Sequence, residues 1–573
     1  MKNGIDNSTS PRRNIGRGEI LYTDEPFTIA DLFIQAAKKF PDTKLLNFKR
    51  EDRWQSYTSR EVLEKIENCA FGLYSLGLRR GDRAAILAPN SPEWTFADAG
   101  CQFAGIIDVP IYTTLAPASV EYILRDSGSR VLFLESRAMF EELKSAISNI
   151  ESLEKISIFG GDAGSDQIAF ADLLLKGSEL KGDTKLLEAL RSAIVPENIA
   201  TLIYTSGTTG EPKGVMLNHN CIISNVIDAS ENFEFAVDDV PLSVLPLSHI
   251  FERSAMYLYI YHGMSVHYAE SIEKVADNLR EVRPTIFVGV PRIFEKVYSK
   301  AKLAAAHGGR IKEWIFDWAI SVAERFALKT EQSEPIPFFL SIKHRLADKL
   351  VFSKLRDFFG GRLRACITGG AALSKDIYLI FNGAGISIAQ GYGLTETSPV
   401  LTSNNPKTFR LGSVGKPIHN VQVRIAEDGE IEVTGPGVML GYYNKPKKTR
   451  EAFTEDGWFR TGDIGRIDDD GFLYITDRKK ELFKTSGGKY IAPAPIEQMI
   501  RTSRFVNQVV LVGNERNFAS ALIVPNFEML ESYVKHKGLK QMTHAELCKD
   551  PKIHDLIERQ VAAVTKELAR YET

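Results

Sequence analysis

The sequence predicts an α/β fold: a large N-terminal domain of two α/β subdomains with a small β-rich module, followed by a smaller α+β domain. The chain has 573 residues, more than one ordinary core holds, which favours about three or four subdomains. From residue 27 to about residue 135, helical patterns alternate with short apolar runs, as expected for parallel strands joined by crossover helices. Between residues 364 and 477, further short apolar runs read as strands.

The N-terminal alternation is built from ordinary helix and strand signals. Ser91 followed by Pro92 is typical of a helix start, and Gly77 is typical of a helix end. The predicted elements, in order, are a helix over 59–78, a strand over 83–88, a helix over 91–105, a strand over 106–112, a helix over 118–128 and a strand over 130–135.

The rest of the chain adds three kinds of segment. Residues 221–233 predict a helix, whereas 241–254 and 284–297 each predict a strand that runs into a loop. Residues 300–360 are mostly helical. Near the end of the strand-rich part, Asp428 and Gly429 predict the turn of a β-hairpin.

The helical stretch over 300–360 carries basic and aromatic faces, including Trp314, Phe316 and Trp318. Such a face is consistent with peripheral contact at a membrane surface. It is also typical of a helix whose apolar side packs on the protein body, and this second interpretation is favoured because such faces are usually core.

One stretch, 204–215, predicts a phosphate-binding loop. It is rich in hydroxyls and glycines, which supply donors and allow the backbone to approach an anion, and it ends near a lysine. The apolar run 200–204 before it reads as a buried strand, which argues against a flexible linker. Its candidate phosphate ligands are Thr205, Ser206, Gly207, Thr208, Thr209, Gly210 and Lys213.

Composition excludes several classes of protein. The 71 Lys and Arg residues nearly balance the 73 Asp and Glu residues, so no nucleic-acid partner is expected. The five cysteines form no Cys-x-x-Cys pair, which fits a reducing cytoplasm. No signal peptide and no transmembrane segment is expected, so the predicted location is cytoplasmic, with peripheral contact at the inner membrane face as the further option.

Five segments together resemble the adenylate-forming enzymes, and within them the long-chain fatty acid CoA ligases. They are the phosphate loop, "LPLSHIFER" at 245–253, "GYGLTET" at 391–397, "GWFRTGDIG" at 457–465 and "DRKKELFKTSGGKYIAP" at 477–493. The resemblance implies that a fatty acid, ATP with Mg²⁺, and coenzyme A as co-substrate react through an acyl adenylate. It also implies that the C-terminal domain is mobile.

The resemblance also assigns roles to individual residues. Lys213 and the loop would hold the leaving pyrophosphate, Glu396 the Mg²⁺ ion and Thr395 the α-phosphate, while His249 would lie near the acyl carboxylate. Without the resemblance, Glu396 reads as an acid at a helix start and His249 as a structural histidine. The remaining expected nucleotide-site residues are Gly369, Gly370, Ala371, Gln390, Gly391 and Tyr392 around adenine, Asp463 and Arg478 at the ribose, and Lys480 at the hinge.

The acyl tunnel and the end of the chain carry the last expectations. Val288, Gly289, Val290 and Pro291 fall where the family lines its tunnel. The expected domains are residues 1–479 and 480–573, with the second incomplete. The family's adenylation lysine has no counterpart after 480, since Lys566 lies in another context. Two explanations stay open, a shortened reading frame or a chain that has lost adenylation. The alternative functions are an acyl-AMP ligase serving a carrier protein and a weak nucleotide or acyl-adenylate binder.

Overall fold

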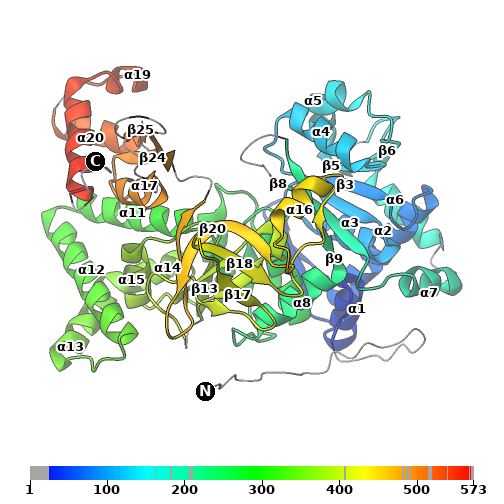
Figure 1. Cartoon of the computed structure of the whole chain (residues 1–573), viewed down its shortest axis with the longest axis horizontal. Coiled ribbons are helices and arrows are strands. Elements are labelled where there is room, and N and C mark those ends of the chain that lie inside the picture. Colours follow the sequence, from blue (N-terminus) through cyan, green and yellow to red (C-terminus); the bar gives the residue numbers. More distant parts are fainter. Residues whose placement is uncertain are drawn as a thin grey trace.

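The computed structural model describes residues 25–161, 163–180, 183–205, 211–405, 408–479, 483–484, 490–491, 493–513, 516, 519–538, 540–566 and 568. Two large sheets and a smaller one, with their helices, form most of the molecule, and a separate group of helices and short strands follows at the C-terminal end (Figure 1). The predicted α/β class is therefore confirmed.

The first large sheet has eight strands in the order β19-β9-β8-β4-β3-β5-β6-β7. Its central strands are parallel, as the alternation predicted, whereas β9 is antiparallel to both of its neighbours. The strands are β3 (Arg83–Leu87), β4 (Ile107–Pro110), β5 (Val131–Ser136), β6 (Lys155–Gly160), β7 (Ile168–Ala169), β8 (Ile199–Thr205), β9 (Lys213–Asn218) and β19 (Gly441–Tyr442). The helices of this part are α2 (Ser59–Ser75), α3 (Pro92–Ala104), α4 (Pro117–Ser127), α5 (Arg137–Ile147), α6 (Phe170–Leu180) and α7 (Thr184–Ser192).

The ends of α3 follow directly from its sequence. Ser91 accepts a hydrogen bond from the Trp94 N–H at 3.1 Å, and Pro92 occupies the first turn, where a missing N–H costs nothing. Gly105 ends the helix with φ 66°, a left-handed conformation that favours glycine. These local signals explain why the sequence predicted this helix so closely.

The second large sheet has nine strands in the order β16-β15-β14-β13-β12-β10-β11-β1-β2, parallel in the middle and antiparallel at both edges. The sequence predicted a strand running into a loop at 241–254 and at 284–297. Both strands are present, but each is followed within a few residues by a helix that was not predicted. The strands are β1 (Lys44–Arg50), β2 (Arg53–Thr58), β10 (Pro241–Ser243), β11 (Val266–Tyr268), β12 (Ile286–Gly289), β13 (Ala365–Thr368), β14 (Ile388–Gly393), β15 (Val400–Ser403) and β16 (Lys416–Pro417). The helices are α1 (Ile29–Lys39), α8 (His219–Ser230), α9 (Ile250–Tyr261), α10 (Val275–Val282), α11 (Pro291–His307), α12 (Arg310–Glu331), α13 (Phe338–Ala347), the π-helix η1 (Asp348–Phe352), α14 (Ser353–Phe358), α15 (Lys375–Gly383) and the 3-10 turn η2 (Thr395–Thr397).

A fully buried ion cluster ties the two large sheets together. Arg253 on α9 forms ion pairs with Asp98 of α3 at 2.5 Å and with Asp108 of β4 at 3.0 Å. It also donates to the Thr201 hydroxyl on β8 at 2.9 Å and to the Tyr257 hydroxyl at 2.8 Å, and Tyr257 donates to Asp98 at 2.7 Å. Because a buried charge is tolerated only when it is paired, this cluster fixes the position of α9 against the first sheet.

The β-rich module and the C-terminal group complete the chain. The predicted hairpin is present, and Gly429 at its turn has φ 84°. Lys479, beside the expected hinge, reaches back to this hairpin and pairs with Asp428 at 2.6 Å and Glu430 at 2.7 Å. The module contains β17 (Gln422–Ile425), β18 (Glu430–Thr434), β20 (Phe459–Ile467) and β21 (Leu473–Arg478), with α16 (Pro446–Ala452) alongside. The C-terminal group contains β22 (Phe483–Lys484), β23 (Tyr490–Ile491), α17 (Pro493–Arg501), β24 (Val506–Val512), β25 (Ser520–Pro525), α18 (Phe527–His536), α19 (His544–Leu547) and α20 (Pro551–Val564).

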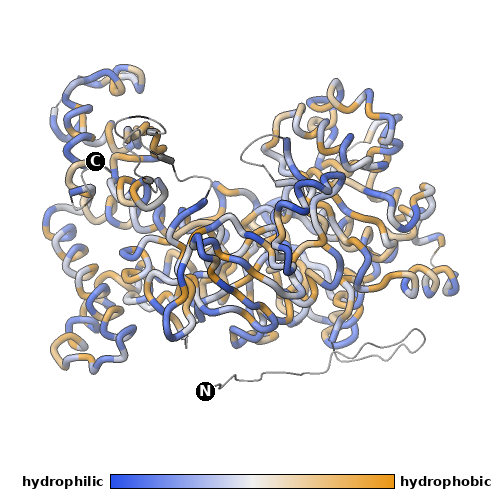
Figure 2. The backbone as a smooth tube through the Cα atoms, viewed as in Figure 1, coloured by the Kyte–Doolittle hydropathy of each residue, from blue (hydrophilic) through white to orange (hydrophobic). Residues whose placement is uncertain are grey.

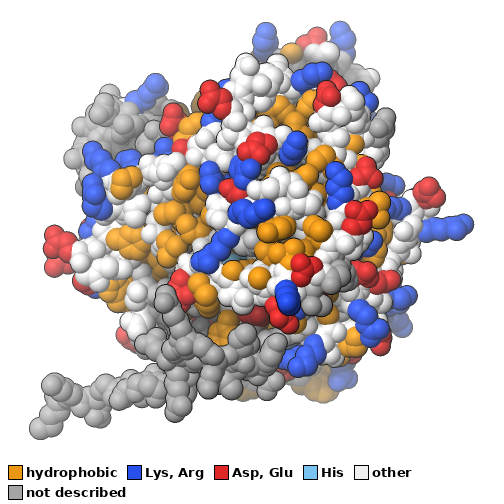
Figure 3. Space-filling view, turned by 90° about the vertical axis from the view of Figure 1, so that its right-hand side faces the viewer, with side chains coloured by type: hydrophobic (Ala, Val, Ile, Leu, Met, Phe, Trp, Pro, Cys, Tyr) orange, Lys and Arg blue, Asp and Glu red, His pale blue; other side chains and the backbone are white. Residues whose placement is uncertain are grey.

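The long helices α12 and α13 project at one edge of the molecule, where polar and apolar residues alternate along the backbone (Figure 2). Phe316 is only 5% exposed and packs in a core with Ala319 and Ala323, so the favoured interpretation is confirmed for this face of α12. In contrast, Trp314 is 67% exposed. On the face shown in Figure 3, acidic and basic side chains are interspersed, in agreement with their balanced numbers.

Candidate active site

A cavity of about 960 Å³ lies where the two large sheets and the β-rich module meet. One end is lined by charged and polar groups, and the other is an apolar arm between α8 and α9. The cavity brings together predicted site residues from widely separated parts of the sequence: Thr205, Lys213, His249, Gly369, Gly370, Gly391, Tyr392, Thr395, Glu396, Asp463 and Arg478. Two predicted site residues do not line the cavity: Gln390, which precedes Gly391, and Ala371, which follows Gly370.

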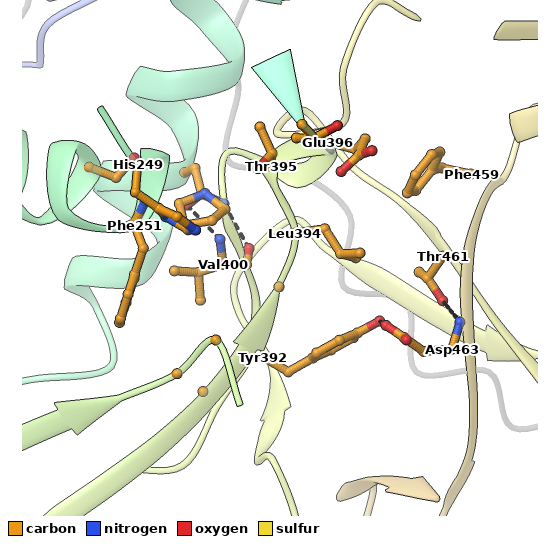
Figure 4. Close-up of a pocket in the computed structure, with 18 of the residues that line it drawn as sticks. His249, Phe251, Tyr392, Leu394, Thr395, Glu396, Val400, Phe459, Thr461 and Asp463 are labelled. Carbon is orange, nitrogen blue, oxygen red and sulfur yellow. Dashed lines mark hydrogen bonds between the residues drawn. The ribbon is translucent and has the colours of Figure 1, made fainter. Parts of the chain in front are cut away.

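At the polar end, three of these residues form a connected group, of which Tyr392 and Asp463 are labelled in Figure 4. The Tyr392 hydroxyl donates to Asp463 at 2.6 Å, and the Arg478 guanidinium pairs with the other Asp463 oxygen at 3.1 Å. Burial and the neighbouring Asp463 carboxylate raise the pKa of Tyr392 well above its usual range, which keeps the phenol protonated. Asp463 is thus held as a carboxylate acceptor inside the cavity.

Two glycines beside this group leave the backbone without side chains next to the cavity. At Gly369, a side-chain carbon would lie 3.4 Å from the Phe251 ring and 3.5 Å from the Gly391 carbonyl oxygen. Gly370 has φ 76°, which favours glycine at this position. The strand end therefore presents bare backbone to the cavity near Tyr392.

Glu396 and Thr395 lie on the 3-10 turn η2, which directs both side chains toward the cavity (Figure 4). The Tyr442 hydroxyl donates to Glu396 at 2.9 Å, and the Lys213 ammonium lies 4.7 Å from the centre of the Tyr442 ring. The Glu396 carboxylate and the Lys213 ammonium therefore lie on the same side of the cavity, each in contact with Tyr442.

Two residues that the sequence did not single out hold this turn in place. The Asn225 amide on α8 donates to the Val400 carbonyl at 2.7 Å, and its oxygen accepts the Val400 N–H at 3.1 Å. Ser254 on α9 donates to the Ser398 carbonyl at 3.2 Å. Several other polar residues share α8, Ser224 and Asp228 among them, so Asn225 carried no distinctive sequence signal for this clamp.

His249 caps the start of α9. Its Nδ1 accepts the Phe251 N–H at 3.1 Å, so the ring hydrogen resides on Nε2. Burial lowers the pKa of His249, which favours the neutral ring. The histidine is therefore both a helix cap and a neutral N–H donor at the cavity.

Part of the predicted site lies outside the described residues: Ser206, Gly207, Thr208, Thr209, Gly210 and Lys480. The flanks of the phosphate loop are described, and Thr205 of β8 pairs directly with Lys213 of β9 in an antiparallel ladder. The loop thus joins two strands of one hairpin, a connection that the sequence did not predict.

The apolar arm differs from the tunnel that the sequence predicted. Its walls are helical and come from Val226, Ala229, Ala255, Leu258 and Tyr259, with Phe233 and Phe235 beyond α8. Of the four tunnel residues predicted on 288–291, only Val288 lines the cavity. A side-chain carbon at Gly289 would meet the Phe287 ring at 2.8 Å, so this glycine makes room for a neighbouring aromatic ring rather than for a ligand.

Comparison with known proteins finds two matching families. The AMP-binding enzyme family matches residues 33–443, and the AMP-binding enzyme C-terminal domain matches residues 481–563. Among curated relatives, the long-chain-fatty-acid–CoA ligase FadD15 of Mycobacterium tuberculosis is 36% identical over 94% of this chain and 89% of its own length. The peroxisomal long chain acyl-CoA synthetase 7 of Arabidopsis thaliana is 32% identical over 97% of this chain and 81% of its own length.

Solved structures share the fold. The anthranilate CoA ligase AuaEII in complex with anthranoyl-AMP matches with a TM-score of 0.69 at 21% identity, covering 96% of this chain and 93% of that one. ATP-bound MatB from Rhodopseudomonas palustris matches with a TM-score of 0.67 at 22% identity, covering 95% and 93%. At these identities the likeness establishes the arrangement of the chain, including its smaller C-terminal part.

Proposed function

Because the chain belongs to the AMP-binding enzyme family, we propose that it joins a long-chain fatty acid to coenzyme A through an acyl adenylate made from ATP. The observation that carries this proposal is one continuous cavity with a charged end and an apolar arm. A nucleotide and an alkyl chain need opposite surroundings, and this cavity supplies both side by side.

At the charged end, the residues are arranged to hold a nucleotide. Asp463 accepts hydrogen bonds from the ribose hydroxyls, while Arg478 pairs with the same carboxylate and orients it. Tyr392 packs its ring on adenine above the bare backbone at Gly369 and Gly370. Lys213 faces the β- and γ-phosphates, which leave as pyrophosphate.

In the first step, an oxygen of the fatty acid carboxylate attacks the α-phosphorus, and the bond from that phosphorus to pyrophosphate breaks. Thr395 donates to the α-phosphate, where negative charge develops. In the second step, the coenzyme A thiol loses its proton to water, its sulfur attacks the acyl carbon, and the bond from that carbon to the AMP phosphate oxygen breaks. His249 presents its neutral Nε2–H to the carboxyl group between these steps.

Glu396 fits a magnesium ion. Mg²⁺ in nucleotide sites takes one or two carboxylates and completes its shell with phosphate oxygens and water. Glu396 supplies one carboxylate, and the described residues contain no cluster of three or more acidic, histidine or cysteine ligands that would suit a different metal site. When bound, the ion would neutralise charge on the phosphates.

The function is tested with two assays on the whole chain. Palmitate with ATP and Mg²⁺ should cause pyrophosphate release, and added coenzyme A should be consumed with formation of AMP. Separately, palmitoyl adenylate and coenzyme A should give the thioester without ATP. Pyrophosphate release without consumption of coenzyme A would favour an acyl-AMP ligase serving a carrier protein. ATP binding with neither reaction would favour a nucleotide or acyl-adenylate binder.

Replacing Asp463 with asparagine should weaken ATP binding roughly 10- to 100-fold, because hydrogen bonds to a charged acceptor contribute about 1.5 to 3 kcal/mol. Titration calorimetry with ATP and with 2′-deoxy-ATP measures this loss, and the preference for the ribose hydroxyl should fall as well. Asp470→Asn is the control, since Asp470 lies on the same module but is 63% exposed. An unchanged ratio between the two nucleotides would contradict the ribose assignment.

We also propose peripheral contact with an anionic membrane through α13. Phe338 and Phe339 at its start are 75% and 76% exposed, and Ile342 and Leu346 continue the same surface at 48% and 51%. Lys343, Arg345 and Lys349 are exposed alongside. The one acid between 338 and 352, Asp348, pairs with Arg356 at 2.6 Å, so the surface is basic and apolar.

Co-sedimentation with phosphatidylglycerol vesicles at low salt tests this contact. Replacing Phe338 and Phe339 with serine should reduce binding about 10-fold or more, because burying one such side chain contributes about 1.5 to 3 kcal/mol. Ile272→Ser is the control, at a residue that is 77% exposed elsewhere. Equal binding of all three proteins would contradict the assignment.

No helix in the described ranges has the length and apolar character needed to cross a bilayer. We place the protein in the cytoplasm on the state of its thiols, because Cys69, Cys101, Cys221 and Cys366 are all buried and unpaired.

A further inference from the structure

The apolar arm runs along α9, from the nucleotide end of the cavity to the far end of the helix. Phe251, in the first turn, lies against Gly369, so the start of α9 borders the nucleotide end. Leu258 and Tyr259, about two turns later, line the arm at its other end. Leu258 follows Phe251 by seven residues, a rise of about 10 Å along the helix axis.

Two phenylalanines close the far end. Phe233 and Phe235 follow the last turn of α8, both line the cavity, and their ring centres lie 5.5 Å apart. The Phe235 ring also lies 5.2 Å from the ring of His262, which follows the last residue of α9. The two helix ends are therefore bridged by aromatic side chains.

The segment that carries these rings is held at both of its ends. Phe233 N–H donates to the Ser230 carbonyl at the end of α8. On the other side, Asp239 accepts the Ala236 N–H at 2.8 Å and the Thr285 hydroxyl at 2.7 Å. Because the backbone is tied down, the rings themselves decide how far the arm extends.

This wall is thin. Phe233 and Phe235 are only partly buried, and Glu234 between them is exposed. An acyl chain longer than the arm would have to displace one of these aromatic rings. A shorter acyl chain would leave a void between its end and the rings.

On the basis of the proposed function, we infer that Phe233 and Phe235 form the end wall of the acyl site and set the upper limit of acyl chain length. Removing a ring opens the arm toward solvent and admits longer chains. Enlarging a ring shortens the arm and excludes them. Since each methylene that fits or clashes in an apolar pocket changes kcat/KM by about 10-fold or more, the effect should appear as a shift in chain-length profile.

The experiment compares kcat/KM for octanoate, laurate, palmitate and stearate in Phe233→Ala, Phe235→Ala and Phe233→Trp. Both alanine variants should raise the stearate-to-laurate ratio about 10-fold, and the tryptophan variant should lower it by a similar factor. Phe27→Ala is the control, because Phe27 is 44% exposed and lies outside the cavity. Equal changes for all four acids, or no change, would overturn the inference.

Displacement of a bound fluorescent fatty acid by the same four acids gives a second measurement that needs no turnover. If the displacement profile shifts in the variants although no acid supports thioester formation, the end wall stands and the proposed ligase function fails. If the enzyme is active but neither profile shifts, the ligase function stands and the end wall is wrong. Opposite shifts for the alanine and tryptophan variants also separate a change of shape from a general loss of folding.

Discussion

Replacing Glu396 with glutamine is expected to slow palmitate-dependent pyrophosphate release roughly 10²- to 10³-fold. The substitution keeps the shape of the side chain but removes its charge, and loss of one preorganised group that stabilises developing charge has about this effect. Stopped assays of pyrophosphate against Mg²⁺ concentration measure it. The dependence on Mg²⁺ should move to higher concentration, because the proposed ion site loses its carboxylate.

Two variants serve as controls for Glu396. Tyr442→Phe removes the hydroxyl that donates to Glu396 and should cost about 10-fold, as is usual for a group that orients a metal ligand. Glu451→Gln changes another carboxylate at the cavity, one that is paired with Lys448, and should leave the Mg²⁺ dependence unchanged. If Glu396→Gln and Glu451→Gln behaved alike, Glu396 would have no special relation to the metal.

Replacing Arg253 with methionine is expected to lower the free energy of unfolding by about 3 to 5 kcal/mol, because it leaves two carboxylates buried without their cation. Urea denaturation followed by fluorescence measures the loss. Arg130→Met is the matched control: Arg130 pairs with Asp82 and Glu154 at a partly exposed site, where about 0 to 1 kcal/mol is expected. Similar losses in both variants would show that the buried cluster contributes nothing beyond an ordinary surface pair.

The Arg253 cluster also predicts a pH dependence. Burial raises the pKa of Asp108 to about 7 from its usual 3.8, so the folded protein binds more protons than the unfolded chain between these values. The contribution of this group to stability is complete below the unfolded pKa and is lost as the pH rises through about 7. In Arg253→Met, the destabilisation should grow further above that pH, which urea midpoints at several pH values would record.

The sequence predicted those parts of the fold that are encoded locally. Three of these local signals lie where the structure has the matching element: Ser91 with Pro92, the Asp428–Gly429 turn, and the apolar runs of the central strands. Motifs likewise brought residues as distant as Lys213 and Asp463 into one predicted site, and the structure places both at one cavity. Their individual roles remain predictions.

What the sequence missed depends on where side chains point after folding. Gly289 was expected to line the acyl tunnel, but the space beside its α-carbon is occupied by the ring of Phe287. The arm itself is built from α8 and α9, whose apolar residues are indistinguishable in sequence from ordinary core. Asn225 acts through the backbone of a segment 175 positions away, at Val400, and a separation of this size leaves no local pattern.

The clamp made by Asn225 has a consequence for kinetics. Asn225 donates at 3.3 Å to the Thr397 carbonyl of the turn that carries Glu396, and the next residue of α8, Val226, lines the apolar arm. Under the proposed function, an alkyl tail that fills the arm presses on the same helix that positions Glu396, the proposed Mg²⁺ ligand. Binding energy from the remote alkyl chain can then be expressed in turnover rather than in affinity. Shortening the fatty acid should accordingly depress kcat more than it raises KM.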